Sequence, residues 1–299
     1  MKIGNAKKIT ALLLALLLAM AALAGCGSGD NTGDDQDGQG DQQGQQEQQN
    51  GETGGDTSLQ DILDQGEISV AISPDYAPYE YLDLASGEVK GSDIELAKYI
   101  AKELGVTLKI EQMNFESCLA AVQSGSCDIS TSCLSWTQDR AESMALSEYY
   151  NQDASHAQTV LVMKEEADHY KTAADFDGKK IAAQNGTTQW EMTTSQLTGA
   201  SAEAISVIGD GIMMLLQDKV DGVALPVNVA ESYTQTYDEI AIPEFMFDNE
   251  EIGNVVATKL GNDALLEKLN EIVKKAEAEG LCKQWLEEAT ADAQAQGLI

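Results

Sequence analysis

One arginine gives the clearest sign of ligand chemistry in this sequence. Arg140 is the only arginine among 18 basic residues, and the others are all lysines. A guanidinium is planar and holds a carboxylate through two parallel hydrogen bonds, whereas a lysine supplies only a point charge. Ser135 and Gln138 have the spacing of a helix-capping pair, so we expect Arg140 in the first turn of a short helix that follows a strand at 128–132. The alternative is a surface arginine that pairs with neighbouring acids.

A second candidate site is the segment 184–191, where a predicted strand gives way to a helix. Gly186 permits a tight turn, and Thr188 and Glu191 have capping-box spacing. Free backbone N–H groups at a helix start favour an anion such as a carboxylate. Most such turns bind nothing, so the segment is informative only together with Arg140.

Aromatic side chains form a third element. Tyr76 lies between two prolines in the segment 74–79, and Phe115 begins a predicted helix. Such rings can sandwich an apolar stem or an ammonium group. Packing in the core is the alternative for both.

The acidic composition excludes several classes of partner. Asp and Glu total 50 against 18 Lys and Arg, which gives a net charge of -32, while 43% of the residues are hydrophobic. Such a surface repels phosphate backbones and anionic headgroups, so we expect no nucleic-acid binding. The 299 residues can form two lobes of roughly 100–150 residues each.

Histidine and cysteine usage argues against metal and nucleophilic chemistry. His156 and His169 are the only histidines, which leaves few routes to a metal site or a His-dependent triad. We therefore expect no metal and no cofactor. Four cysteines follow Cys26, and the sequence does not give their pairing, so free and mostly buried thiols are the expectation: Cys118, Cys127, Cys133 and Cys282.

Residues 1–25 are typical of a targeting segment. Three lysines in the first ten residues precede a run at 11–24 that has no polar side chain. This run is short for a bilayer crossing, which needs about 20 residues. The segment ends in Leu23-Ala24-Gly25-Cys26, which is similar to the bacterial lipobox and implies lipidation of Cys26, for example with palmitate. A general secretory signal with an incidental cysteine is the alternative.

Residues 26–58 would then form a tether. The stretch 27–57 contains only Gly, Ser, Thr, Asn, Gln, Asp and Glu, so it cannot bury a core and should stay disordered. A coil of this length reaches roughly 30 Å. We expect an extracytoplasmic body that is anchored to the cell membrane without spanning it.

Strands and helices alternate through the body, which implies parallel sheets with crossover helices. In such folds, ligands lie outside the carboxyl ends of the strands. We expect strands at 68–73, 106–113, 128–132, 159–163, 180–184, 205–208 and 220–225, and helices at 93–104, 115–123, 188–197, 211–217 and 262–279.

Eight short motifs follow one another in order between about residues 68 and 286. They are YAPYEY at 76–81, GSDIELA at 91–97, FESCL at 115–119, QSGSCD at 123–128, TQDR at 137–140, DGKKI at 177–181, NGTT at 185–188 and KVDG at 219–222. Together they resemble the polar-amino-acid solute-binding proteins of ABC importers.

The resemblance implies an α/β fold of the type II periplasmic-binding-protein kind, with two lobes joined by two crossing strands. It places the first lobe at 59–151 plus 253–299 and the second lobe at 158–247. It also implies a monomer that binds a small-molecule carboxylate, such as an amino acid, and delivers it to an ABC permease.

The resemblance also implies roles for individual residues. Ser135 and Arg140 would hold the ligand carboxylate from the first lobe, and Thr187 would close on it from the second. Tyr76 and Phe115 would stack on the ligand. The rest of the site would be lined by Ser132, Cys133, Gln184 and Gln189.

Two departures concern the ligand's ammonium group. The family usually has an aspartate where this sequence has Pro226, and often a second acid where it has Ser73. An ammonium buried without a carboxylate loses several kcal/mol relative to a paired one. Either Asp75, Glu191 or Asn228 substitutes, or the ligand is not an ordinary α-amino acid.

We therefore expect a non-enzymatic, lipid-anchored binding protein. One rival is an enzyme on the same scaffold, such as a dehydratase, for which Glu191 is the candidate acid or base. The other rival is a sensory receptor module, which is normally fused to a transmembrane and signalling segment.

Overall fold

The computed structural model describes residues 55–152, 156–250 and 252–299. The expected signal peptide, Cys26 and nearly all of the expected tether lie outside these residues. No helix within the described ranges is long and apolar enough to cross a membrane.

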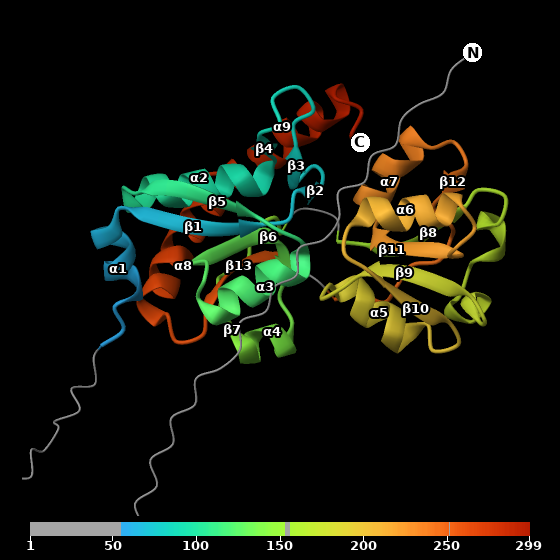
Figure 1. Ribbon diagram of the computed structural model, residues 1–299, viewed down its shortest axis with the longest axis horizontal. Helices are drawn as coiled ribbons and strands as arrows, with labels where there is room; N and C mark the ends of the chain where they lie inside the picture. Colours follow the sequence, from blue (N-terminus) through green and yellow to red (C-terminus); the bar gives the residue numbers. More distant parts are fainter. Residues whose placement is uncertain (1–54, 153–155, 251) are drawn as a thin grey trace, which may run out of the picture. The chain divides into compact units, whose positions relative to one another are not determined.

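The first lobe contains a five-stranded sheet in the order β5-β1-β6-β13-β7 (Figure 1). The strands β1, β5 and β6 are parallel, while β13 runs antiparallel to β6 and β7. Their bounds are β1 Glu67–Ile72, β5 Thr107–Gln112, β6 Ile129–Ser135, β7 Met144–Leu146 and β13 Asn254–Lys259.

Helices cover both faces of this sheet. Val70 and Val256 pack in the cluster that contains α2 and α8, whereas Ala71 and Val255 pack with residues of α3. Neighbouring strand residues point to opposite faces, so one alternating pattern fills both interfaces. The helices are α1 Ser58–Gln65, α2 Ser92–Leu104, α3 Phe115–Ser124, α4 Gln138–Ser143, α8 Asp263–Ala278 and α9 Leu281–Ala295.

The second lobe has its own five-stranded sheet, in the order β10-β9-β11-β8-β12 (Figure 1). Leu161 and Val223 face the cluster of α6 and α7, and Val160 and Ala224 face the opposite cluster, which includes α5. The bounds are β8 Gln158–Met163, β9 Lys180–Gln184, α5 Thr188–Gln196, β10 Ser201–Ile205, α6 Ile208–Leu216, β11 Gly222–Pro226, α7 Val227–Thr236 and β12 Ile240–Ala241; two 3₁₀ turns are Ala167–His169 and Ala173–Phe176.

A small third sheet lies beside the first lobe. It consists of β2 Asp75–Tyr76, β3 Glu80–Leu82 and β4 Val89–Lys90, in the order β2-β3-β4. Within it, Tyr76 pairs with Glu80 across two antiparallel strands. Directly opposed residues point to the same face, so the Tyr76 ring and the Glu80 carboxyl group lie together.

The chain passes between the lobes twice, once from β7 to β8 and once from β12 to β13. The two passages are joined by a bridge between Tyr150 and Asn254, whose backbone N–H groups each donate to the other's carbonyl at 2.8 Å. At the second lobe, Phe247 N–H donates to the Gln158 carbonyl at 2.9 Å. The expected α/β architecture with two lobes and two crossing segments is confirmed.

The expected strand at 205–208 is wrong. The strand β10 ends at Ile205, and α6 begins at Ile208. Ile208, Ile212 and Leu215 are all buried on one face of that helix. The apolar run 205–208 therefore contains the end of one element and the start of the next.

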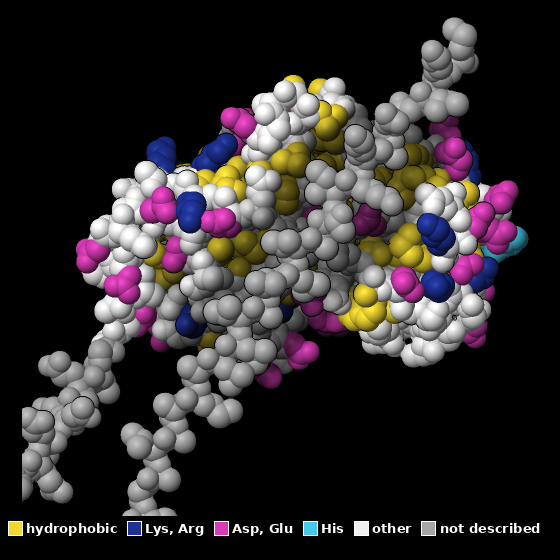
Figure 2. All heavy atoms as spheres, in the orientation of Figure 1, with side chains coloured by type: hydrophobic (Ala, Val, Ile, Leu, Met, Phe, Trp, Pro, Cys, Tyr) yellow, Lys and Arg dark blue, Asp and Glu magenta, His cyan; other side chains and the backbone are white. Residues whose placement is uncertain are grey.

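Acidic side chains are spread over the face drawn in Figure 2 and are interspersed with lysines. Several of them form exposed ion pairs, such as Lys98 with Glu95 at 2.7 Å. Exposed pairs of this kind contribute little stability. On this face, the acidic side chains are thus dispersed and do not form one patch.

Candidate functional site

A cavity of about 550 Å³, including the part open to solvent, is lined by residues of both lobes. It lies where β1 and β6 of the first lobe and β9 and β11 of the second lobe end, because Ser73, Ser135, Gln184 and Pro226 all line it. This is the position expected for a ligand site in an α/β fold.

All nine residues that the sequence predicts for ligand binding line this cavity. Their contacts with a ligand remain predictions. The nine are Tyr76, Phe115, Ser132, Cys133, Ser135, Arg140, Gln184, Thr187 and Gln189.

Arg140 lies in the first turn of α4, as expected, but Thr137 caps that helix instead of Ser135. The Thr137 hydroxyl accepts the Arg140 backbone N–H at 3.2 Å. The Arg140 side chain is only 6% exposed, so the alternative of a surface arginine is wrong. Its Nη1 donates to the Ser135 carbonyl at 2.7 Å, and its Nη2 donates to the Gly186 carbonyl at 3.0 Å. The guanidinium therefore joins the first lobe to the second.

Thr187 is the N-cap of α5, one residue before the expected Thr188. Its hydroxyl accepts from the Trp190 N–H at 3.2 Å and donates to the Gln184 carbonyl at 2.7 Å. Gly186 has a φ of 76°, a conformation that favours glycine, and it turns the chain from β9 into this cap. The helix start thus faces the cavity, as an anion site requires.

The aromatic residues line the cavity from the first lobe. Tyr76 and Tyr79 are stacked with their ring centroids 5.6 Å apart, and the Tyr79 hydroxyl accepts from Asn228 Nδ2 at 3.0 Å. The Phe115 ring lies 5.5 Å from Arg140 Cζ and also packs against the buried Leu134 cluster. Phe115 therefore both packs in the core and lines the cavity.

Asp75 forms hydrogen bonds across the cleft. Its Oδ2 accepts from Gln184 Nε2 and from the Ile208 N–H, both at 3.1 Å, and its Oδ1 accepts from the Ser73 hydroxyl at 2.8 Å. Burial raises the pKa of Asp75, and hydrogen bonds from Ile208 and Ser73 oppose that rise. Of the three groups that could replace the missing ammonium partner, Asp75 and Asn228 line the cavity. Glu191 is exposed and does not, so that expectation is wrong.

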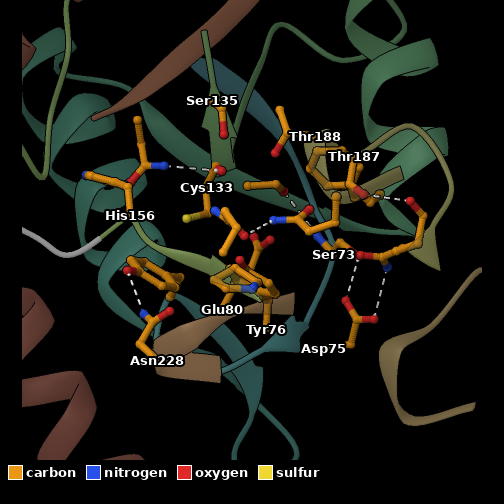
Figure 3. A pocket seen from close by; sticks show the side chains of 18 of the residues that line it. Ser73, Asp75, Tyr76, Glu80, Cys133, Ser135, His156, Thr187, Thr188 and Asn228 are labelled. Atoms are coloured by element: carbon orange, nitrogen blue, oxygen red, sulfur yellow. Dashed lines mark hydrogen bonds between the residues drawn. The ribbon is translucent and has the colours of Figure 1, made fainter. Parts of the chain in front are cut away.

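Glu80 is an acid in the cavity that sequence reasoning missed. Its side chain is 1% exposed, and its Oε2 has no hydrogen-bond partner among the described residues. Burial, followed by the nearby charge of Asp93, raises the pKa of Glu80 well above its usual value. Glu80 and Tyr76 lie close together in Figure 3, in agreement with their pairing across β2 and β3. The sequence signal that could have predicted Glu80 as a lining residue is its position directly opposite Tyr76 in a short hairpin.

Other missed lining residues lie in a crossing segment or at the start of the strand that follows one. Asn254 Nδ2 donates to the Cys133 carbonyl at 3.3 Å, and His156 Nε2 lies 3.1 Å from the Asn151 carbonyl oxygen. Gln158 Oε1 accepts from Gln189 Nε2 at 2.8 Å. No motif marks these residues, because their partners are distant in sequence or lie within the crossings.

The four cysteines of the described body are free thiols. Cys133 lines the cavity with a φ of 46°, and its backbone N–H donates to the Asp93 carboxylate. Burial raises the pKa of Cys118, so that thiol stays protonated. Within the described ranges, no group of three or more His, Cys, Asp or Glu side chains could hold a metal ion.

Curated relatives of this chain are named as binding proteins, and one of them is "ABC transporter arginine-binding protein 1" of Escherichia coli. "Arginine-binding extracellular protein ArtP" of Bacillus subtilis is 27% identical over 228 residues, which cover 73% of this chain and 86% of the relative. "L-cystine-binding protein TcyJ" of Escherichia coli is 24% identical over 232 residues, which cover 76% of this chain and 85% of the relative.

Solved structures show the same fold. The amino acid ABC transporter substrate-binding protein AbpA of Streptococcus pneumoniae, bound to L-arginine, is 31% identical with a TM-score of 0.74 and covers 78% of this chain and 98% of its own. The ancestral amino acid-binding protein AncCDT-1, a precursor of cyclohexadienyl dehydratase, is 26% identical with a TM-score of 0.68 and covers 78% of this chain and 99% of its own. The type II fold expected from the sequence is thereby confirmed.

A family model described as "Bacterial extracellular solute-binding proteins, family 3" matches residues 68–289. That match spans nearly the whole described body and well over half of the chain. The chain therefore belongs to the bacterial extracellular solute-binding proteins of family 3.

Proposed function

We propose that this chain is the substrate-binding component of an ABC importer and that its cavity holds an amino acid or a close analogue. The buried guanidinium of Arg140 carries this proposal, because it lies at the junction of the lobes in a cavity that is lined by both. A planar fork of N–H donors at this position is suited to a carboxylate. The relatives that bind arginine and cystine support an amino acid as the ligand.

The ligand-binding roles of the nine predicted residues belong to this proposal. Arg140 and Ser135 hold the carboxylate from the first lobe, and the Thr187 hydroxyl and N–H approach it from the second. Tyr76 and Phe115 contact the ligand stem. The lobes themselves are taken as 59–151 plus 253–299 and 158–247.

Ligand binding acts by shifting the population toward a closed state. Contacts already cross the cleft in this structure, since Asp75 accepts from Gln184 and Arg140 donates to Gly186. A ligand that touches both lobes adds contacts that only the closed state provides, so it stabilises that state by the difference. The permease then distinguishes closed from open protein.

A ligand screen tests the proposal. The purified chain is assayed by thermal shift against the twenty amino acids, L-cystine, amines and small organic acids, and each hit is measured by calorimetry. A tight ligand raises the melting temperature by mass action. The proposal predicts at least one amino acid among the hits; binding confined to compounds without a carboxylate would contradict it.

Turnover separates this function from that of an enzyme. The likeness to a precursor of a dehydratase and the buried acid Glu80 favour the enzyme as the second candidate. Each ligand is incubated with the protein and analysed by mass spectrometry. Binding without product supports transport, whereas steady conversion of the ligand identifies an enzyme.

Lipid anchoring completes the proposal. Residues 1–25 are removed as a signal peptide, Cys26 receives the lipid, and residues 26–58 tether the body outside the cell membrane. Labelled palmitate should enter the wild-type protein but not Cys26→Ser, which should appear in the soluble fraction. Equal labelling of both would exclude Cys26 as the anchor.

A further inference from the structure

Two acids of the first lobe lie close together in the interior, at the wall of the cavity. Glu80 of β3 lines the cavity and is 1% exposed, and Asp93 in the first turn of α2 is 0% exposed. The Asp93 N–H donates to the carbonyl of Tyr79, the neighbour of Glu80, at 3.0 Å. Gly91 approaches this stretch so closely that a side chain there would overlap the Tyr79 carbonyl. The backbone therefore fixes the two acids near each other.

Each of these two carboxyl groups is only partly satisfied. Oε2 of Glu80 and Oδ1 of Asp93 are buried and have no hydrogen-bond partner among the described residues. A buried carboxylate that lacks both a cation and a full set of donors is strongly disfavoured, and such a group takes up a proton instead.

The basic side chains of the described body have other partners. Lysines form their ion pairs with other acids, such as Asp83. Two basic side chains line the cavity: Arg140 donates to two backbone carbonyls, and His156 Nε2 lies 3.1 Å from the Asn151 carbonyl oxygen. No ion pair therefore balances Glu80 or Asp93 within the described residues.

The remaining ionisable neighbours of Glu80 are acidic or neutral. Asp75 of β2 adds a further repulsion to that of Asp93. Burial raises the pKa of the Cys118 thiol on α3 and of the Tyr150 hydroxyl in the crossing, so both groups stay protonated. Three more ionisable groups line the same cavity: Tyr76, Tyr79 and Cys133.

The two acids differ in how well a negative charge is supported. Asp93 Oδ2 accepts from the Cys133 N–H, and the N-terminus of α2 favours an anion at this position. Burial raises the pKa of both acids, but the Cys133 N–H opposes this rise in Asp93, whereas the charge of Asp93 adds to the rise in Glu80. Glu80 is therefore the acid that keeps a proton to the higher pH.

We propose that Glu80 is a neutral carboxylic acid at neutral pH, so that Glu80 and Asp93 together hold at most one negative charge beside the cavity. Glu80 pairs with Tyr76 across the hairpin of β2 and β3. A second buried charge would drive this hairpin away from α2. The proton thus holds in place the wall that carries Tyr76 and Tyr79, and its loss at alkaline pH loosens that wall. This property belongs to the protein without ligand, so its tests do not depend on the proposed function.

Nuclear magnetic resonance tests the protonation directly. The full chain is labelled with carbon-13 at the side-chain carboxyl carbons of glutamate and is measured at about pH 7. One glutamate resonance should have the position of a neutral acid while the others have that of a carboxylate. This resonance should vanish in Glu80→Gln and remain in Glu191→Gln, which makes the same change at an exposed site near the cavity.

Two results of this measurement would overturn the inference. One is a wild-type spectrum in which every glutamate is a carboxylate, and the other is a neutral-acid resonance that persists in Glu80→Gln. If Glu80→Gln does not fold, as judged by circular dichroism, Glu80→Asp replaces it, because that variant also removes the glutamate resonance.

Stability measured against pH gives an independent test. An unfolded glutamate loses its proton at about pH 4.3, whereas native Glu80 keeps its proton to a higher pH. Below pH ~4.3 both states hold the proton. Above it only the native state does, so rising pH favours unfolding until native Glu80 also ionises. The unfolding constant of wild type should therefore rise relative to that of Glu80→Gln by about tenfold for each pH unit.

Equilibrium unfolding in urea, followed by circular dichroism between about pH 5 and pH 8, measures this ratio. The ratio of wild type to Glu191→Gln should stay constant, because an exposed carboxyl group has similar surroundings in both states. A constant ratio of wild type to Glu80→Gln, or one that falls with pH, would show that native Glu80 is ionised and would overturn the inference.

Discussion

The two lobes contribute to the same cavity in different ways. The first lobe supplies ionisable groups on buried positions, with Arg140 6% and Glu80 1% exposed. The second lobe supplies amides, hydroxyls and the N-terminus of α5, where Thr187 is the cap. The first lobe can therefore recognise the charge of a ligand while the protein is open. The second lobe then closes on the same ligand through neutral hydrogen-bonding groups.

Removing the guanidinium of Arg140 should have the largest effect on ligand affinity. Arg140→Ala should weaken ligand binding by about a hundredfold or more, and Arg140→Lys by at least tenfold, because an ammonium cannot form two parallel hydrogen bonds. Calorimetry with the best amino acid from the screen measures both variants. Unchanged affinity in Arg140→Lys, with a wild-type circular dichroism spectrum, would argue against carboxylate recognition by the first lobe.

Removing the main contact across the cleft should have a smaller effect. Asp75→Ala deletes the acceptor of the hydrogen bonds from Gln184 and Ile208. Hydrogen bonds to charged groups contribute about 1.5–3 kcal/mol, so the closed state should become rarer and affinity should fall by about tenfold. Small-angle X-ray scattering should show a larger radius of gyration without ligand than wild type has. An unchanged radius would mean that these bonds do not control closure.

A single neutral contact of the second lobe should matter less. Asn228→Ala removes the hydrogen bond to the Tyr79 hydroxyl at 3.0 Å. One such bond contributes about 0.5–1.5 kcal/mol, so affinity should fall by about two- to tenfold in calorimetry. A loss of affinity as large as that of Arg140→Ala would contradict the view that the first lobe supplies the strong charged contacts and the second lobe supplies weaker neutral ones.

The smallest effect is expected on removing the hydroxyl of Thr188, which does not cap α5. Thr188→Ala leaves Thr187 in place as the N-cap of α5, so the melting temperature of the unliganded protein should match wild type. Thr187→Ala removes the cap and should lower stability by about 1 kcal/mol. The reverse order in thermal denaturation would place the cap at Thr188.

Local sequence patterns predicted the strand-end residues well. Arg140, Gln184 and Thr187 could be anticipated because a strand that gives way to a helix places its last residues at the sheet edge. The cap of α5 could not be assigned from the sequence, since Thr187 and Thr188 are adjacent hydroxyls and the tight turn at Gly186 decides between them.

Long-range pairing limited the prediction. The strand β13 enters the first sheet between β6 and β7 from the far end of the chain, and its residue Asn254 bonds to Cys133 across 121 positions. Nothing local to Asn254 indicates this partner. Glu80 was missed for a related reason, since its burial depends on Asp93 and α2 as well as on its own hairpin.

A crystal structure with the tightest amino acid from the screen tests the central claim most directly. Both carboxylate oxygens of the ligand should lie within hydrogen-bond distance of the Arg140 guanidinium, between the first lobe and the start of α5. A ligand bound elsewhere, with the Arg140 side chain turned into solvent, would contradict the account.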